Sequence, residues 1–373
     1  MVDMVKLEEM KAFVLRKQRE ASERIGDLFP HINPEYKEYD LSESVGWTGG
    51  FYTGVNYLCY EMSRDPYFLQ AAQLPLEKME AQLNEKGTKL GHDIGFLYSL
   101  AHYADYVITG NEDSKAVTIQ AAETLIKRFK TNGNYIQAWD IWSPAYADNA
   151  TRMIIDCMYN LPLLFRAYEL TGEQKFYDIA LAHAKTAQKY LIREDYTTPH
   201  TFVFNEEGTD GVERTHQGAA DDSCWARGQG WAVTGFAMAY RFTGNAEFLE
   251  IAKNCARVFF EKTEEDLIPK WDLIFQGQEG VPLDTSAASI VGNGLMEIYD
   301  ATGDAFYKET AYKMLVNLYD KYSTKDDAAC EGLIKDATSH HPAGKGIRSC
   351  LIYGDYYFAE LLSRFLGTSK GYW

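Results

Sequence analysis

A turn pattern that recurs along the chain constrains its fold more than any other feature. Four places after a tyrosine, a turn residue stands at positions 64, 110, 172, 244 and 303; it is glycine except at Arg64, and Gly367 marks a weaker sixth copy. Glycine is favoured just after a helix because it readily adopts the left-handed conformation that ends one. The Asn, Asp or Glu that follows each of the five turns suits the start of another helix. The pattern therefore predicts repeated helix–turn–helix units.

The stretches on either side of each turn have helical periodicity. Residues 96–107 precede a turn and are largely apolar, whereas residues 176–191 follow a turn and have one more polar face. Six hairpins of an apolar inner and an amphipathic outer helix predict one all-α domain over residues 1–373, a closed double ring called an (α/α)6 barrel. An open α-solenoid is the alternative, but the turns are unequally spaced and the inner helices are too apolar for an exposed concave face. Strands have little support beyond a short hairpin at 200–211.

The helix starts can be estimated by counting back from the turns. Inner helices of about 16 residues would begin on one shared rim. Counting back 16 or 17 residues from the six turns reaches Trp47, Asp93, Asp156, Arg227, Ser286 and Cys350. An aromatic ring, two carboxyl groups and a guanidinium at equivalent heights predict a functional pocket at that end of the ring.

Asp156 and Asp93 are the candidate catalytic residues. Asp156 lies in RMIIDCMYNLPLL (152–164), which we interpret as a helix, and its apolar neighbours should raise its pKa toward that of a general acid. A buried structural aspartate is the alternative. Asp93 is either a second functional carboxylate or only the N-cap of its helix. His92 beside it is as compatible with a structural role as with ligand contact.

Residues 215–231 are rich in hydrogen-bonding and aromatic groups. Arg227 and Trp231 are four residues apart and so share a helical face, with Gln217 in the loop above. Arginine suits a carboxylate and tryptophan offers a stacking surface. The alternative is a loop that packs its own aromatic rings. The adjacent His340 and His341 suggest a metal site, but no third ligand stands at useful spacing. We therefore expect no metal and no cofactor.

Composition narrows the classes of partner. With 37 basic and 54 acidic residues, the formal charge is −17, which disfavours nucleic acid and anionic membranes as partners. The six cysteines form no CxxC pair, the N-terminal residues do not resemble a signal peptide, and no long apolar run occurs. These features predict reduced thiols, a cytoplasmic location and no membrane span. The oligomeric state is left open.

Several segments together resemble one known family. They are GHDIGFLYSL (91–100), RMIIDCMYNLPLL (152–164), HTFVF (200–204), THQG (215–218), WARGQGW (225–231) and YGDYYF (353–358). The chain is similar, from WTGGFYTG at 47–54 to GYW at 371–373, to the unsaturated glucuronyl hydrolases of glycoside hydrolase family 88. The resemblance implies an (α/α)6 barrel that acts on unsaturated uronic-acid-containing di- and oligosaccharides released by polysaccharide lyases.

The resemblance also implies roles for individual residues. Asp156 would protonate C4 of the C4=C5 double bond and then act as base for the water that adds at C5, releasing a 4-deoxy-5-keto uronate. Asp93 would hold ring hydroxyls or position the water. The implied substrate-binding residues are Trp47, His92, Trp139, His200, Gln217, Arg227, Trp231 and Lys345. Among them, Trp47 and Trp231 would sandwich the unsaturated ring.

Two departures from the family pattern and three alternatives remain. Residues 140–155 are less glycine-rich than is usual in the family, and Ala343 stands near Lys345 where a hydroxyl would help to bind a sulfate. The second departure weakens the expectation of activity on sulfated disaccharides. The alternatives are an unsaturated rhamnogalacturonyl hydrolase, a conventional inverting glycosidase or sugar epimerase on the same ring, and a non-catalytic sugar-binding protein.

Overall fold

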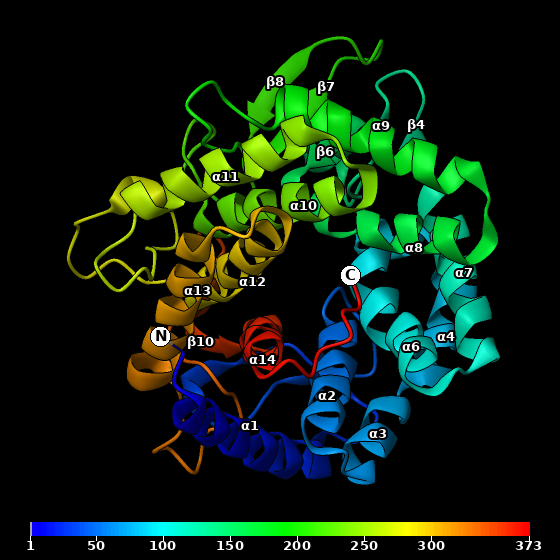
Figure 1. Cartoon of the computed structure of the whole chain (residues 1–373). Coiled ribbons are helices and arrows are strands. Elements are labelled where there is room, and N and C mark those ends of the chain that lie inside the picture. The colour runs from blue at the N-terminus through cyan, green and yellow to red at the C-terminus, as the bar shows by residue number, and fades with distance from the viewer. Residues whose placement is uncertain (1) are drawn as a thin grey trace.

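The structure is a computed structural model that describes residues 2–373. Two concentric rings of helices form the body of the protein (Figure 1). The inner ring consists of α2 (Gly49–Ser63), a run of α5 (Ile94–Tyr98), a π-helical turn (Ser99–Tyr103) and α6 (Ala104–Thr109), then α8 (Leu161–Thr171), α10 (Ala226–Thr243), α12 (Thr285–Thr302) and α14 (Ile352–Leu366). The outer ring consists of α3 (Pro66–Gln73), α4 (Leu76–Lys86), α7 (Glu112–Ile126), α9 (Gln174–Tyr190), α11 (Ala246–Glu261), α13 (Ala305–Asn317) and α1 (Met4–Ile25).

The first helix of the chain completes the ring. Helix α14 packs against α2, which closes the inner circle, and α1 lies outside both of them. The inner helices α10, α12 and α14 are buried along nearly their whole length, whereas the outer helices bury one face. The (α/α)6 barrel predicted from the turns is thus confirmed. Among residues 2–373, no helix has both the length and the apolar character needed to cross a bilayer.

The recurring turns have the predicted geometry. The turn residues are in the left-handed region, with φ of 60° at Arg64, 76° at Gly110, 73° at Gly172, 67° at Gly244, 71° at Gly303 and 69° at Gly367. In the first five, the N–H of the turn residue donates to the carbonyl of the tyrosine four places earlier, at 2.7 to 2.8 Å. This bond satisfies a carbonyl that the helix end leaves free.

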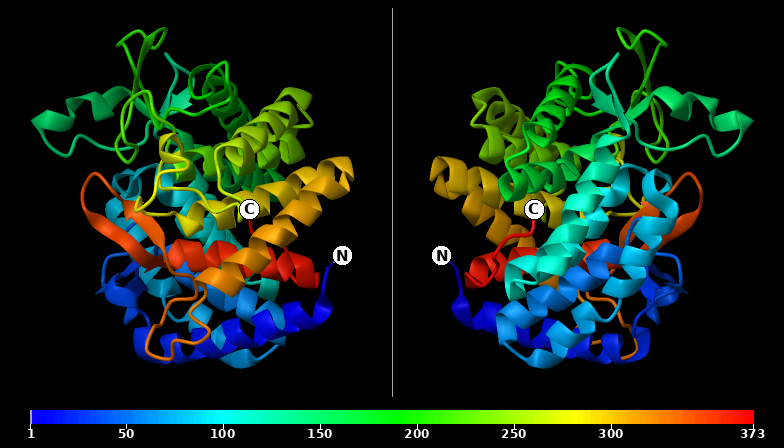
Figure 2. Two further views of the ribbon diagram at one scale, coloured as in Figure 1. Left: turned by 90° about the vertical axis from the view of Figure 1, so that its left-hand side faces the viewer. Right: turned by 90° about the vertical axis from the view of Figure 1, so that its right-hand side faces the viewer.

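Short strands gather at one end of the barrel, more of them than the sequence predicts. Two sheets have three strands each: β6 (Arg152–Ile154), β7 (Thr201–Phe204) and β8 (Gly211–Arg214); and β2 (Ile32–Asn33), β10 (Lys345–Leu351) and β9 (Ala337–His340). Two further pairs are β1 (Phe29–Pro30) with β3 (Leu41–Ser42), and β4 (Phe129–Lys130) with β5 (Tyr135–Ile136). The side views show the loop after β5 and the β9–β10 hairpin extending from the same end (Figure 2). The hairpin expected at 200–211 is confirmed, but the one at 337–351 was not expected.

The helix expected over residues 152–164 is wrong in its first half. Residues 152–154 form strand β6, residues 155–159 form a 3-10 turn, and α8 begins only at Leu161. Pairing of Met153 with Phe202 in the neighbouring strand draws the first residues into a sheet, and Pro162 favours a helix that starts beside it. Asp156 therefore lies on a tight turn between strand and helix.

Candidate active site

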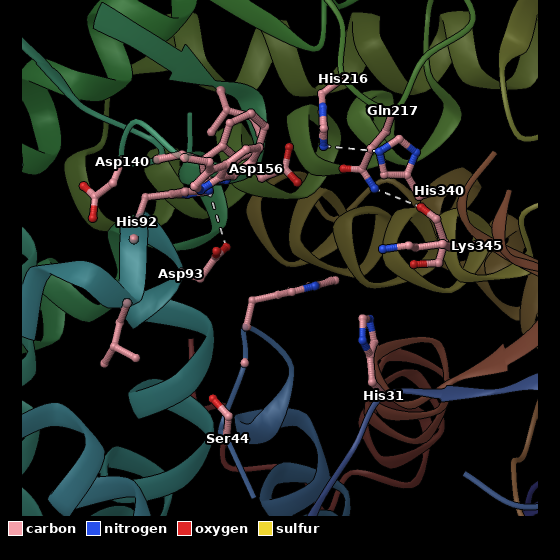
Figure 3. Close-up of a pocket in the computed structure, with 18 of the residues that line it drawn as sticks. His31, Ser44, His92, Asp93, Asp140, Asp156, His216, Gln217, His340 and Lys345 are labelled. Carbon is pink, nitrogen blue, oxygen red and sulfur yellow. Dashed lines mark hydrogen bonds and ion pairs between the residues drawn. The ribbon is translucent and has the colours of Figure 1, made fainter. Parts of the chain in front are cut away.

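A cavity of about 480 Å³ opens at the end of the barrel where the strands and long loops lie. Eight of the ten predicted catalytic and substrate-binding residues line it: Trp47, His92, Asp93, Trp139, Asp156, Gln217, Arg227 and Lys345. Figure 3 shows the carboxyl groups of Asp93 and Asp156 facing the same space from different elements. His200 and Trp231 do not line the cavity, although both lie directly behind it.

The first carboxyl group, that of Asp156, is held by the 3-10 turn that precedes α8. The turn is anchored because the N–H of Ile155 donates to the carbonyl of His200 at 3.1 Å. The Asp156 side chain is only 14% exposed. Burial raises its pKa to about 7, and the positive charge of Arg227 opposes part of that rise. A carboxyl group with this pKa can give up and take back a proton near neutral pH.

The second carboxyl group belongs to Asp93, immediately before α5. Asp93 occupies the N-cap position of that helix, but its side chain makes no capping hydrogen bond to it. Burial raises the pKa of Asp93 well above its ordinary value, and the nearby charge of Asp156 raises it further. Because each negative charge disfavours the other, Asp93 retains its proton when Asp156 has lost one. Two acids in one cavity can therefore differ in protonation state.

A histidine side chain lies next to each of these carboxyl groups. Nε2 of His92 lies 3.4 Å from Oδ1 of Asp93, and Nε2 of His200 lies 3.7 Å from Oδ1 of Asp156. Burial lowers the pKa of both imidazoles well below the usual value, so both are neutral. Nδ1 of His200 accepts hydrogen bonds from the backbone N–H groups of His216 and Gln217, at 3.0 and 3.1 Å. The proton of His200 therefore resides on Nε2, facing Asp156.

Arg227 lines the cavity, and partners within the protein accept hydrogen bonds from part of its guanidinium. The guanidinium donates hydrogen bonds to Oδ2 of Asp284 at 2.5 Å, to the carbonyl of Thr338 at 2.7 Å and to the carbonyl of Ser339 at 2.5 Å. These bonds use three of the five N–H donors of the guanidinium, so the predicted contact of Arg227 with a substrate carboxylate stays a prediction. Its bonds fasten strand β9 to the start of α10, while its charge acts on Asp156.

Trp231 lies beneath the cavity floor and is fully buried. Its ring centroid is 5.3 Å from that of Phe96 and 5.1 Å from that of Tyr159. Trp47, in contrast, lines the cavity, and its ring centroid is 5.9 Å from that of Phe96. The structure therefore does not place Trp47 and Trp231 as the two faces of an open slot, because Trp231 is fully buried and Phe96 packs against both rings.

Several lining residues were not predicted from the sequence to be catalytic or substrate-binding. They include His31, Trp142, His216, Trp225, Ser339 and His340. They come from loops and strands without helical periodicity, so counting back from the turns does not reach them. Reading residues 337–340 as a strand would have helped, because neighbouring side chains of a strand point to opposite faces.

The two adjacent histidines, the last residue of β9 and the first of the turn after it, point in different directions. Nε2 of His340 lies 3.2 Å from Nε2 of His216 at the cavity, whereas the ring of His341 stacks on Trp271 at 4.2 Å. They do not converge on one point. Within residues 2–373, no group of three or more His, Cys, Asp or Glu side chains is arranged to hold a metal ion.

An (α/α)6 barrel whose end cavity holds two buried carboxyl groups is an arrangement suited to acid–base catalysis. The family model of Glycosyl Hydrolase Family 88 matches residues 21–360, and the chain belongs to this family of glycoside hydrolases. It is 35% identical to the unsaturated glucuronyl hydrolase of Bacillus sp. (strain GL1), with 94% of each chain covered. The crystal structure of the Bacillus sp. GL1 enzyme matches with a TM-score of 0.94 at 34% identity, with 98% of both chains covered.

A second relative is named after a chondroitin disaccharide. The unsaturated chondroitin disaccharide hydrolase of Streptococcus pneumoniae is 36% identical over 90% of this chain and 85% of its own length.

Proposed function

We propose that this chain removes the unsaturated uronic acid from the end of di- and oligosaccharides, by hydration of its C4=C5 double bond. The observation that carries the proposal is the Asp156 carboxyl group, whose pKa of about 7 suits it to protonate carbon and then accept a proton from water. Family membership supports the substrate class, because both relatives described above are named for hydrolysis of unsaturated uronyl saccharides.

The reaction begins with proton transfer to carbon. Asp156 gives its proton to C4, the electron pair of the double bond forms the new C4–H bond, and positive charge develops on C5 and the ring oxygen. The resulting carboxylate of Asp156 stabilises that charge in the largely buried site. Water then adds at C5 and returns a proton to Asp156, so the acid is regenerated.

Release of the partner sugar follows without further help from the protein. The hemiketal at C5 opens to a ketone and leaves a hemiacetal at C1, whose collapse frees the partner sugar and the 4-deoxy-5-keto uronate. The reacting carbon is not the anomeric one, so the carboxyl separation that distinguishes retaining from inverting glycosidases does not apply.

The remaining residues hold the unsaturated ring. Asp93 keeps its proton and donates a hydrogen bond to a ring hydroxyl or the water. The rings of Trp47 and Trp139 offer stacking surfaces, and Gln217 and Lys345 contribute polar contacts from the opposite side of the cavity. Arg227, already paired with Asp284, acts on the substrate carboxylate through its charge. Trp231 supports the floor.

A panel of unsaturated disaccharides tests the proposal, with loss of ultraviolet absorbance of the double bond as the readout. We expect turnover of at least one unsaturated member and none of the matching saturated disaccharide. Cleavage of the saturated sugar would instead support a conventional glycosidase.

The cytoplasmic location also stays a proposal, supported by the free, buried state of all six cysteines.

A further inference from the structure

A short loop at the rim of the cavity exposes an unusual amount of apolar surface. Among residues 2–373, nine large hydrophobic side chains are exposed, and three of them stand within six positions of the chain: Ile141 at 55%, Trp142 at 51% and Tyr146 at 39%. Exposure of two aromatic rings side by side is unfavourable unless something covers them. The loop lies between β5 and β6 and is the stretch that departs from the glycine-rich family pattern.

The aromatic rings continue outward from the cavity in a connected series. Trp139 and Trp142 both line the cavity, and their ring centroids are 5.1 Å apart. Tyr146 lies outside it, with its ring centroid again 5.1 Å from that of Trp142. The ring of His216 flanks Trp142 at 5.7 Å. A ligand that leaves the cavity along this side meets one ring after another.

The loop is held rigidly at both ends. The buried amide of Asn149 donates to the carbonyl of Asp140 at 3.0 Å, and its oxygen accepts from Nε of Arg152 at 2.9 Å. The amide of Gln137 donates to the carbonyls of Trp139 and Asn149, at 2.7 and 3.0 Å. The exposed rings are therefore oriented before any ligand arrives, which lowers the entropy lost on binding.

The charges near the loop are already paired within the protein. Asp140 forms an ion pair with Arg128 at 3.0 Å, and Asp148 pairs with Arg152. The exposed surface of the loop is thus dominated by aromatic rings. Such rings suit the face of a sugar ring, because its polarised C–H groups approach the negative face of an aromatic ring.

We propose that Trp142 and Tyr146, here called the aromatic platform, bind the sugars that lie beyond the first partner sugar of an unsaturated oligosaccharide. This inference rests on the proposed function and narrows its substrate class. The cavity holds the unsaturated ring and its neighbour, and the aromatic platform adds contacts available only to tri- and longer saccharides. The chain therefore turns over unsaturated tetrasaccharides with a lower KM than the corresponding disaccharides.

Two substrates that differ only in length test the aromatic platform. A lyase releases unsaturated di- and tetrasaccharides from hyaluronan. Both carry no sulfate and have the same linkage next to the unsaturated ring, and kcat and KM are measured for each. We expect Trp142→Ala to raise the ratio of the tetrasaccharide KM to the disaccharide KM by about fivefold, and Tyr146→Ala to raise it less. Trp142→Phe, which keeps an aromatic face, should restore most of the wild-type ratio. Phe306→Ala is the matched control, because it removes an equally exposed ring (54%) on α13.

The outcomes separate the two proposals. If Trp142→Ala changes both KM values equally, the ring only packs against Trp139 and the aromatic platform is wrong. An unchanged ratio in both alanine variants refutes it as well. Calorimetric titration of the inactive Asp156→Asn variant with each saccharide gives the same ratio from binding alone. Absence of turnover by the wild-type protein would overturn the proposed function. The ratio of the two binding constants would still test the aromatic platform.

Discussion

The imidazole of His200 directs its Nε2–H toward Asp156 across 3.7 Å, and two backbone N–H groups fix that orientation from the other side of the ring. A neutral donor dipole placed there favours the ionised form of the carboxyl group and offsets part of its desolvation. His200 does not line the cavity. In the proposed reaction it therefore acts through Asp156 as a positioning residue.

His200→Asn tests that relationship with little disturbance to the loop. The asparagine oxygen can replace Nδ1 as acceptor for the two backbone N–H groups, but nothing replaces Nε2–H. We expect kcat to fall about tenfold and the basic limb of the pH profile to move to higher pH, because the Asp156 carboxylate loses a stabilising dipole. His200→Ala, which also leaves the two N–H groups unpaired, should lower stability in addition. A pH profile of His200→Asn identical to that of the wild type would contradict the role.

Asp156→Asn removes the proposed acid without changing the shape of the side chain. We expect the turnover rate to fall about a thousandfold, because proton transfer to C4 has no donor. Calorimetry should still show binding of an unsaturated disaccharide. Asp300→Asn, at an exposed carboxylate on α12, serves as the control and should retain full activity. Near-normal loss of the double-bond absorbance in Asp156→Asn would show that another group delivers the proton.

The pH dependence of the rate follows from the pKa of Asp156, which is raised to about 7. The proposed reaction needs this carboxyl group in its protonated form at the start, so kcat/KM should be highest on the acidic side of neutral. Above about pH 7 it should fall tenfold for each pH unit. Initial rates from pH 5 to 9 at low substrate concentration measure this limb. A rate that still rises above pH 8 is incompatible with Asp156 as the acid.

The sequence predicts those parts of the site that depend on local rules. A left-handed turn residue ends each inner helix, so the rim can be reached by counting, and this locates Asp93, Asp156 and Arg227 at the cavity. The count succeeds at Asp156 although α8 is short, because a 3-10 turn occupies the remaining length.

What the sequence does not predict depends on partners far away in the chain. The ion pair between Arg227 and Asp284 joins residues 57 positions apart, and no local pattern indicates it. The same holds for the contact between His216 and His340, which joins a loop to strand β9. The burial of Trp231 is likewise set by Phe96 and Tyr159 on other elements. Helical spacing shows which face of α10 carries Trp231 but not how deep that face lies.

The buried carboxyl group of Glu360 makes stability depend on pH. Glu360 lies on α14, is 3% exposed and accepts a hydrogen bond from Tyr356 at 2.9 Å. Burial raises its pKa to about 7, whereas in the unfolded chain it is about 4.3. Between these values the folded protein binds a proton that the unfolded chain has lost, so this group lowers the free energy of unfolding as the pH rises.

Glu360→Gln should remove this contribution while keeping the shape of the side chain. Relative to wild type, the variant should gain up to about 3 kcal/mol in the free energy of unfolding as the pH rises from about 4 to about 7.5. Urea denaturation at several pH values measures the difference. Comparison with wild type is essential, because buried histidines such as His102, whose pKa is lowered to about 4, shift stability in the opposite direction. Parallel curves for the two proteins would show that Glu360 is ionised in the folded state.

Trp373 closes the inner ring on the side away from the cavity and packs against the turn that carries Asp156. Its ring is 4% exposed and meets Tyr159, the last residue of that turn, edge-on with centroids 4.7 Å apart. Its carbonyl oxygen accepts hydrogen bonds from Arg166 at 2.6 Å and Arg241 at 2.7 Å, which ties it to α8 and α10. The indole thus supports the turn that carries Asp156 from the side away from the cavity.

Trp373→Ala should therefore affect both stability and rate. We expect a loss of about 3 kcal/mol in the free energy of unfolding from the cavity left behind, and a fall in kcat with KM little changed, because the Asp156 turn loses its support. Trp373→Phe should recover most of kcat. Phe248→Ala, which empties an equally buried position on α11, provides the comparison and should lower stability without lowering kcat. If Trp373→Ala retains the wild-type kcat at a temperature where it is fully folded, Trp373 stabilises the ring without positioning the acid.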